Sequence, residues 1–472
     1  MGVLLISPPS VVHAANVPLN LADAVRETLQ SNLDLAARRR GLAADRENVE
    51  IARSSLLPQA TFKANAQHLD DDRSDGSRGN TTQDSATVQA SATQVLYDEA
   101  AWAKLSIEKH VYAGQEQQFE SFRLSLIEEA ATIFLELERT RALVRIQEEN
   151  RELTRANLET TRQRIATGYS GKREVLRWES QLAGNEQDVV DAQTAALGSL
   201  FDLNRVRSAP RETRVTLQPT DIDVYGFLYS REAVVQAIAS PEGARALREF
   251  LVDVALERSP VLDSIKEAIA AEQRQLTASK RSFWIPSVSI GAGINHLAAN
   301  SSGGSSDSTG SGSGDSTFND TEWAVGVGLE LPLFQGGARF SEVRQAAESV
   351  SGLRLARQAA ADSIDQSVRT AVARTTGDHA VIGFARAQQA AARENVELVV
   401  ASYELGAASI LALLDAQTQL LSADLGLTNA TYDFLEGLIA VEQQLSFYPF
   451  LESATEVDEI LDDLEVRVRP YR

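Results

Sequence analysis

Several segments of the chain alternate between apolar residues and polar or small ones, which is the pattern of a β-strand with one apolar face. The alternation is clearest in the second half of the chain, where the apolar positions are Val288, Ile290, Ala292, Ile294, Trp323, Val325, Val327, Leu329 and Leu331. A weaker alternation runs from Ala60 to Ala66 and from Val88 to Ala92. The pattern predicts four strands, at about 59–69, 86–97, 287–297 and 321–334.

The alternation alone does not decide what the strands face. Strands of about ten residues with one apolar face, joined by polar loops, fit a membrane β-barrel. An antiparallel sheet packed on a soluble core gives the same alternation. The chain has no apolar run of about 18 residues, the length of a spanning helix, so a form embedded in a membrane would have to use strands.

Long stretches without proline predict long helices, because proline inside a helix costs about 3 kcal/mol. No proline lies between Pro58 and Pro210 or between Pro332 and Pro449. Within these stretches apolar residues recur at coiled-coil spacings, for example at Leu126, Ala130, Ile133, Leu137, Val144, Leu414, Leu421, Leu425, Tyr432, Leu435 and Ile439. We therefore expect a long helix folded into a hairpin at about 100–208 and another at about 338–447.

The chain consists of two copies of one structural unit. Sliding the sequence along itself pairs Pro58 with Pro286, and a slightly larger shift pairs Gly168 with Gly406. Each copy reads helix, strand, loop, strand, long helix, turn, helix, and the two glycines fall at the hairpin turns. The predicted divisions are a signal-peptide remnant at 1–14, a first repeat at 15–208, an inter-repeat equatorial segment at 209–250, a second repeat at 251–447 and a C-terminal equatorial segment or tail at 448–472.

The first helix is predicted from about Asn20 to near Ser55. Asn20 is a good N-cap, and Asp23 stands at the third helical position. Pro58 and Pro286 then end the first helix of each copy and open the strands that follow. Ahead of this helix, Val12-His13-Ala14 follow a short apolar run with the small residues that a signal peptidase accepts.

Composition excludes several classes of function. The 472 residues include no Cys, so there is no disulfide, no Cys-ligated metal, no cysteine nucleophile and no lipid on an N-terminal cysteine. The net charge of −21 argues against a nucleic-acid partner, because phosphate contacts need clustered Lys and Arg. A phosphate-binding Gly-rich loop, a His-rich metal motif and a nucleophile elbow are all missing. We therefore expect no enzyme activity, no cofactor and no metal site.

Four strands are too few to close a barrel, and open sheet edges are not tolerated in lipid. Long helices also bury little of their apolar stripe within one chain. The chain is therefore expected to oligomerise, so that both the strands and the helices close.

The order of these motifs resembles the outer-membrane factor family, the TolC-like channel proteins of Gram-negative bacteria. The matching features are the proline after each first helix, the strand ends Leu96-Tyr97-Asp98 and Leu331-Pro332-Leu333-Phe334-Gln335-Gly336-Gly337, and the hairpin turns that begin at Gly168 and Gly406. The resemblance covers about 19 to 447. It implies a mainly α fold with a membrane β-barrel: a homotrimer in which four strands per chain form a 12-stranded β-barrel continuous with a long α-helical coiled-coil barrel.

The resemblance also implies a function. Such proteins lie in the outer membrane with a large periplasmic extension and act as the passive exit duct of a tripartite efflux pump or a type I secretion system. The implied partners are a periplasmic adaptor (membrane fusion) protein, an inner-membrane transporter and outer-membrane lipid. The rival hypothesis is a periplasmic or surface coiled-coil protein with a structural or adhesive role, which explains the helices and the acidity but not the paired strands.

Carried over residue by residue, the resemblance assigns a channel gate to the hairpin ends. Asp415 falls on an acid of the aperture, Glu174 on an acidic latch residue and Tyr403 on its tyrosine partner. Gly168 and Gly406 fall at the hairpin tips where the adaptor is expected to dock. Two positions depart from the family pattern: Ala412 replaces a second aperture acid found in some members, and Ala408 replaces a basic latch residue.

Overall fold

The computed structural model describes residues 18–68, 84–166, 171–221, 240–301 and 321–468. The chain divides into two compact units. The sheet unit comprises 40–118 and 263–358, and the helical unit comprises 1–39, 119–262 and 359–472. Within the described residues, no helix is both long enough and apolar enough to cross a membrane.

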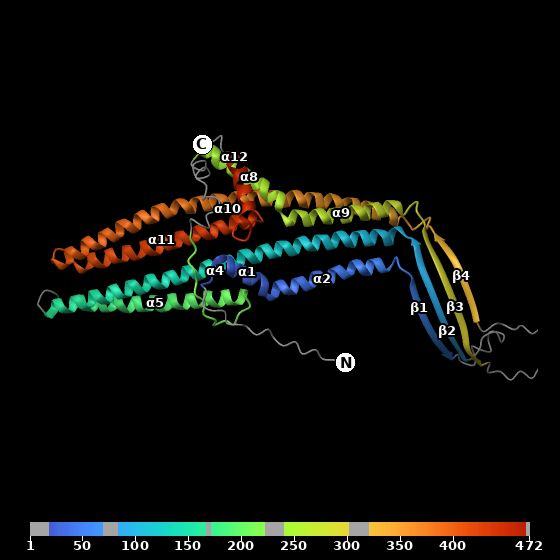
Figure 1. Ribbon diagram of the computed structural model, residues 1–472, viewed down its shortest axis with the longest axis horizontal. Helices are drawn as coiled ribbons and strands as arrows, with labels where there is room; N and C mark the ends of the chain where they lie inside the picture. The colour runs from blue at the N-terminus through green and yellow to red at the C-terminus, as the bar shows by residue number, and fades with distance from the viewer. Residues whose placement is uncertain (1–17, 69–83, 167–170, 222–239, 302–320, 469–472) are drawn as a thin grey trace, which may run out of the picture. The chain divides into compact units, whose positions relative to one another are not determined.

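The sheet unit contains four antiparallel strands in the order β1-β2-β3-β4 (Figure 1). They are β1 (Gln59–His68), β2 (Asp84–Tyr97), β3 (Ser287–Ser301) and β4 (Thr321–Glu330). The register brings the predicted apolar positions into rows across the sheet, one of which is Phe62, Ala90, Ile294 and Trp323. Paired residues point to the same side of a sheet, so the alternation in the sequence becomes one continuous apolar face.

Strands occur at all four predicted places, but two of the ends differ clearly. The strand expected at 287–297 extends to Ser301. The expected strand 321–334 stops at Glu330, because Pro332 has no backbone N–H to donate. Gly336 and Gly337 then take the left-handed φ values of 60° and 85°, which lead the chain into the next helix. Glycine reaches that region without steric cost.

Helices in the sheet unit pack beside the strand ends. They include most of α2 (Leu33–Ser54) and α9 (Pro260–Arg281), together with the N-terminal parts of α4 (Glu99–Ala166) and α10 (Ala338–Glu404). A small core of Val49, Ala52 and Leu105 joins α2 to α4. His110 of α4 contacts Glu267 of α9 at 2.8 Å between Nδ1 and Oε2.

The helical unit contains two long hairpins, as the sequence predicted. One pairs α4 with α5 (Lys172–Val206), and the other pairs α10 with α11 (Ile410–Gln444) (Figure 1). Gly437 of α11 lies so close to α10 that a Cβ there would be 2.8 Å from Thr375 Oγ1. The main core lies in this unit and contains fully buried side chains such as Phe134, Leu203 and Phe434.

The prediction of one uninterrupted helix from Asn20 to Ser55 is wrong. Asn20 does cap α1 (Leu21–Ser31), since its Oδ1 accepts from Asp23 N at 2.7 Å. The helix then breaks at Asn32, whose backbone is extended with φ −62° and ψ 126°. Asn32 Oδ1 accepts from Leu35 N at 2.9 Å, and its Nδ2 donates to Val206 O at 2.9 Å. The buried amide therefore caps a new helix and ties it to the end of α5.

Part of the acidic tail is helical. Helix α12 (Ala454–Val468) packs on α8 (Pro241–Arg258) through Ile460, Leu461 and Leu464. Helix α8 runs across the boundary predicted at 250. The acidic residues of 454–468 therefore share a helix with a buried apolar face.

Candidate functional site

The candidate site lies at the ends of the two hairpins, where the resemblance places a gate. Five buried residues form the core of this end: Leu158 of α4, Trp178 of α5, Tyr403 of α10, and Ile410 and Leu413 of α11. Trp178 is 0% exposed and Leu413 is 1% exposed. Since these residues come from all four helices, the two hairpins pack together into a single end.

The turn of the second hairpin is a compact helix stop. Gly406 has φ +74°, its N donates to Tyr403 O at 3.0 Å, and Ala407 N donates to Ser402 O at 2.8 Å, which together make a Schellman motif. Ser409 then caps α11, its Oγ accepting from Ala412 N at 3.3 Å. A Cβ at Gly406 would meet nothing within 4 Å, so the glycine is required for its backbone conformation and not for space.

The turn of the first hairpin is only partly described. Gly168 lies outside the described residues, so its predicted place at the tip stays a prediction. Helix α5 begins after Gly171, which offers no side chain to cap it. Within the hairpin, α5 is joined to α4 by the buried hydrogen bond from Asn185 Nδ2 to Thr154 Oγ1 at 2.7 Å.

Tyr403 and Glu174, the two residues assigned to a latch, lie together. Tyr403 Oη donates to Glu174 Oε2 over a long 3.5 Å, and the same hydroxyl is 3.4 Å from Thr161 Oγ1. Tyr403 is 6% exposed, and Glu174 is half-buried in the first turn of α5. A hydroxyl and a carboxylate from different hairpins therefore meet at the edge of the buried cluster.

A cation that the sequence analysis missed completes this group. Arg164, in the last turn of α4, donates from Nη1 to Tyr403 O at 2.6 Å, and its guanidinium carbon lies 4.6 Å from the centroid of the Tyr403 ring. Its position four residues before Gly168 was the available signal, because basic side chains at a helix C-terminus favour contacts with free carbonyl groups. Ala408, by contrast, supplies only an apolar contact to the cluster.

Asp415 lies on α11 six residues beyond the N-cap Ser409 and is exposed. Its Oδ2 accepts from Gln419 Nε2 at 2.9 Å. Ala412, one turn earlier, is also exposed. One chain therefore presents one acid here, on a helix face separate from the Tyr403 group.

Two buried carboxyl groups elsewhere in the helical unit have raised pKa values. Glu138 is 5% exposed, and its Oε1 accepts from Thr220 N at 3.1 Å. Its other oxygen has no hydrogen-bond partner among the described residues, and burial raises the pKa of Glu138 to about 7. Burial likewise raises the pKa of Glu442 well above its usual range.

A model of the outer membrane efflux protein family matches residues 24–206 and 251–445. The chain belongs to this family. The two matched segments correspond to the two predicted repeats, and the family consists of outer-membrane channel proteins, so the expected outer-membrane location and the absence of enzyme activity are confirmed.

Similar proteins cover nearly the whole chain. Outer membrane protein TolC of Vibrio cholerae is 26% identical over 432 residues, covering 90% of this chain and 90% of its own. Outer membrane efflux protein BepC of Brucella suis is 22% identical over 440 residues, covering 91% and 86%. Both are named as outer-membrane proteins.

Solved structures of outer-membrane channels share the fold. The CusC channel superposes with a TM-score of 0.72 at 17% identity, covering 92% of this chain and 95% of its own. The open-state MtrE channel of Neisseria gonorrhoeae superposes with a TM-score of 0.70 at 17% identity, covering 92% and 89%. At this identity the likeness concerns the fold alone.

Proposed function

We propose that this chain is the outer-membrane exit duct of a tripartite efflux pump or of a type I secretion system. Three copies with four strands each would close a barrel of 3 × 4 = 12 strands, continuous with a tube of helical hairpins. The duct itself is passive. An inner-membrane transporter supplies the energy, and a periplasmic adaptor joins the two.

The observation that carries this proposal is the uncovered apolar face of the sheet. Along β4 the apolar positions are exposed: Trp323 by 76%, Val325 by 63%, Val327 by 69% and Leu329 by 69%. Every described position of β1 is exposed as well. Such a face is stable only against lipid or another protein. Closing the sheet into a barrel also pairs the backbone N–H and C=O groups of the edge strands, which lipid cannot hydrogen-bond.

The helical unit also presents apolar stripes that support assembly. On α5, Leu176, Val190 and Leu197 lie on a heptad line and are 52–59% exposed. On α10, Phe384 is 75% exposed and Leu398, two heptads further along, is 63% exposed. Stripes on two different helices of one chain fit a head-to-tail contact, in which α5 of one copy meets α10 of the next and the ring closes.

The hairpin ends would form the gate of this duct. In a trimer the exposed Asp415 carboxylates would make a ring of three charges, which attracts cations into a narrow pore. The Tyr403 group would hold the two hairpins of each chain together, with Arg164 supplying the positive charge that Ala408 does not. Opening the gate then requires these polar contacts to separate.

The same ends would receive the adaptor. Leu405, beside Gly406, is 85% exposed, and Leu411 is 57% exposed. Apolar side chains on a tight turn offer a small contact surface that a helical partner can cover. Gly168 is predicted at the equivalent tip of the first hairpin. Crosslinking at Leu405 followed by copurification from cells would identify the adaptor.

Membrane fractionation tests the proposal. We expect the protein in the outer membrane, extracted by detergent as a trimer that dissociates on heating. A soluble periplasmic monomer would exclude the duct and favour the coiled-coil structural protein instead.

Planar-bilayer conductance tests the gate. Asp415→Ala should reduce blockade by cations, because it removes the charged ring, and Glu404→Gln, an exposed acid outside the group, should not. Arg164→Gln should open the channel more often, by about tenfold for the loss of one charge-assisted hydrogen bond. Unchanged blockade in Asp415→Ala would remove Asp415 from the gate, and unchanged opening in Arg164→Gln would remove Arg164.

A further inference from the structure

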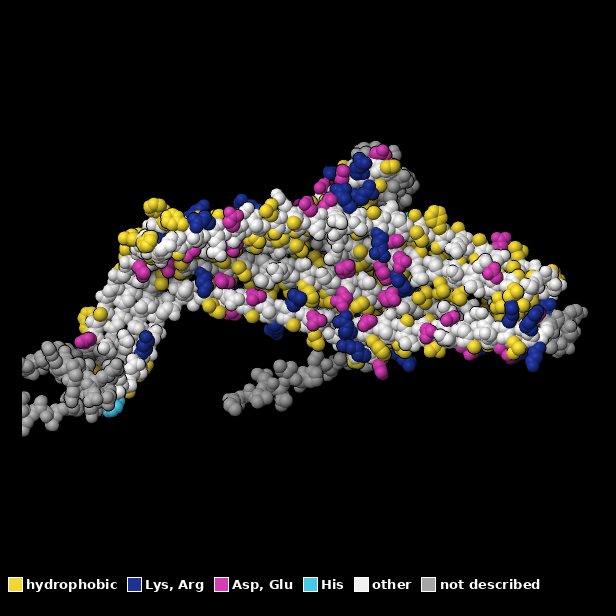
Figure 2. All heavy atoms as spheres, turned by 180° about the vertical axis from the view of Figure 1, so that it is seen from behind, with side chains coloured by type: hydrophobic (Ala, Val, Ile, Leu, Met, Phe, Trp, Pro, Cys, Tyr) yellow, Lys and Arg dark blue, Asp and Glu magenta, His cyan; other side chains and the backbone are white. Residues whose placement is uncertain are grey.

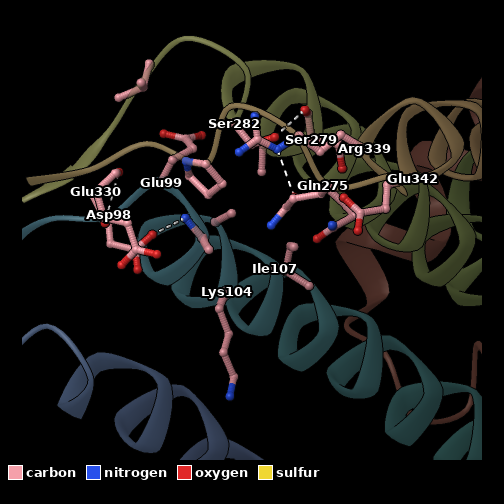
Figure 3. Close-up of a pocket in the computed structure, with 17 residues that line it drawn as sticks. Asp98, Glu99, Lys104, Ile107, Gln275, Ser279, Ser282, Glu330, Arg339 and Glu342 are labelled. Atoms are coloured by element: carbon pink, nitrogen blue, oxygen red, sulfur yellow. Dashed lines mark hydrogen bonds between the residues drawn. The ribbon is translucent and has the colours of Figure 1, made fainter. Parts of the chain in front are cut away.

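A cavity of about 640 Å³ lies in the sheet unit, where the strands meet the helices. It is lined by the start of α4, the end of α9, the chain after β4 and the start of α10. Figure 3 shows Glu99, Ser279, Ser282, Arg339 and Glu342 around it, with the side chain of Lys104 extending away. Its volume is within the range of ligand-binding cavities.

Arg339 is an oriented cation in this cavity. It is 9% exposed, its Nε donates to Gln335 Oε1 at 3.0 Å, and its guanidinium carbon lies 5.6 Å from the centroid of the Phe283 ring. No described carboxylate forms an ion pair with it. Arg339 also lies in the first turn of α10, where the helix dipole favours an anion. The guanidinium is thus held in place with N–H groups left over, and a phosphate fits that geometry.

The carboxylates of the cavity divide into two kinds. Both carboxylate oxygens of Glu99 are already hydrogen-bonded within the protein. Its Oε1 accepts from Arg274 at 2.7 Å, and its Oε2 accepts from the Tyr97 hydroxyl at 2.6 Å. Burial acts to raise the pKa of Glu99, but these hydrogen bonds outweigh it and the pKa is lowered. Glu330 and Glu342 are exposed and form no ion pair within the described part of the chain. They leave negative charge free to meet a cationic group.

Large exposed apolar side chains are sequence neighbours of the residues that line the cavity. Leu333 is 90% exposed and Phe334 is 87% exposed, and both lie between the lining residues Pro332 and Gln335. Trp284, beside the lining residue Ile285, is 82% exposed, and Phe340, beside Arg339, is 63% exposed. Figure 2 shows hydrophobic side chains gathered at this end of the helices. Aromatic side chains of this kind are typical of the boundary between lipid and water.

We infer that this cavity binds the headgroup of a zwitterionic phospholipid, with phosphate on Arg339, ammonium at Glu342, which Figure 3 shows beside it, and acyl chains against Leu333 and Phe334. The inference rests on the proposed function, because it takes the apolar face of the sheet to lie in the membrane. The charges of the cavity favour this headgroup. A purely anionic lipid would place its negative charge near carboxylates with no cation between them, whereas phosphatidylethanolamine carries a negative phosphate for Arg339 and a positive ammonium for the carboxylates.

Native mass spectrometry of the detergent-purified trimer tests the inference, with phosphatidylethanolamine and phosphatidylglycerol added at equal concentration. We expect phosphatidylethanolamine to be retained about tenfold better, the effect of one ionic contact. Arg339→Gln should lower its retention about tenfold, and Arg339→Lys, which keeps the charge, should lower it less. Glu342→Gln should bring the two lipids closer to equal retention. Arg344→Gln, on the same helix outside the cavity, is the control.

Equal retention of both lipids by the wild type, or unchanged retention in Arg339→Gln, would overturn the inference. A loss of trimer in Arg339→Gln with no change in lipid would also overturn it, since a second copy of the chain would then fill the cavity. Failure of the proposed function looks different, because the wild-type protein would not reach the outer membrane or conduct. A conducting trimer that retains no phosphatidylethanolamine contradicts only the lipid site.

Discussion

The helical unit buries its large apolar side chains within one chain, whereas the strands of the sheet unit leave theirs exposed. In the helical unit, Phe134, Leu137 and Phe434 are 0% exposed, and hydrogen bonds such as Asn185 to Thr154 cross between helices. In the sheet unit, every described position of β1 and β4 is exposed. Burying one large apolar side chain contributes roughly 1.5–3 kcal/mol, so the first unit is stabilised largely within one chain. In the proposed trimer, lipid and other copies would supply that stabilisation to the second.

The largest expected difference is in the free energy of unfolding lost when an aromatic residue of each unit is replaced by alanine. Phe434→Ala should destabilise the protein by about 3–5 kcal/mol, because it leaves a cavity in a packed core. Phe62→Ala, at a side chain that is 71% exposed, should change the free energy of unfolding in detergent by less than about 1 kcal/mol. Urea unfolding followed by helical circular dichroism measures both. Equal losses would contradict the division between the units.

A charge on the apolar face of the sheet should act on membrane insertion and not on the helices. Val327→Arg should cost about 2–4 kcal/mol per copy when it faces lipid, and should sharply lower the amount of trimer in the outer membrane. Ala324→Arg, which lies on the opposite face of β4, is the matched control and should be tolerated better. If both variants assembled equally, the two faces of the sheet would not differ in environment.

Buried acids in the helical unit should make its stability depend on pH. Glu138 has a higher pKa in the folded protein than in the unfolded chain, so the folded form holds the proton more tightly. Stability from this group therefore falls as pH rises from about 4.5 to about 7, by up to about 3 kcal/mol. Glu138→Gln should flatten that slope, as measured by urea unfolding at a series of pH values. The exposed Glu404→Gln should leave it unchanged, and an unaltered slope in Glu138→Gln would contradict the burial of this charge.

The smallest effect is expected at the hairpin turn. Gly406→Ala places a Cβ at φ +74° and should cost about 1–2 kcal/mol, although there is open space around it. Gly426→Ala, in the interior of α11 with nothing within 4 Å of the added Cβ, should instead stabilise by up to about 1 kcal/mol. Thermal unfolding of the purified protein compares the pair. Two changes of the same sign would show that the turn does not depend on the left-handed backbone.

Repeating patterns were predictable from the sequence, and side-chain contacts between distant segments were not. Coiled-coil spacing placed Leu126, Ala130 and Leu137, all buried in the core, and alternation placed the strands. The break at Asn32 depends on a hydrogen bond to Val206, far along the chain. Arg164 was missed for the same reason, since its partner Tyr403 belongs to the other repeat. Such contacts have no local period from which they can be predicted.

Closure of the sheet between copies is the central claim, and disulfide trapping tests it most directly. The chain has no Cys, so only introduced thiols can react. Ala60, Phe62 and Ala64 share a face with Val325 through the register of the sheet. Val325→Cys combined in turn with Ala60→Cys, Phe62→Cys or Ala64→Cys should give, for at least one pair, a covalent trimer on non-reducing electrophoresis of outer membranes. Monomers for every pair, or a ladder that does not end at three, would contradict a closed barrel of three chains.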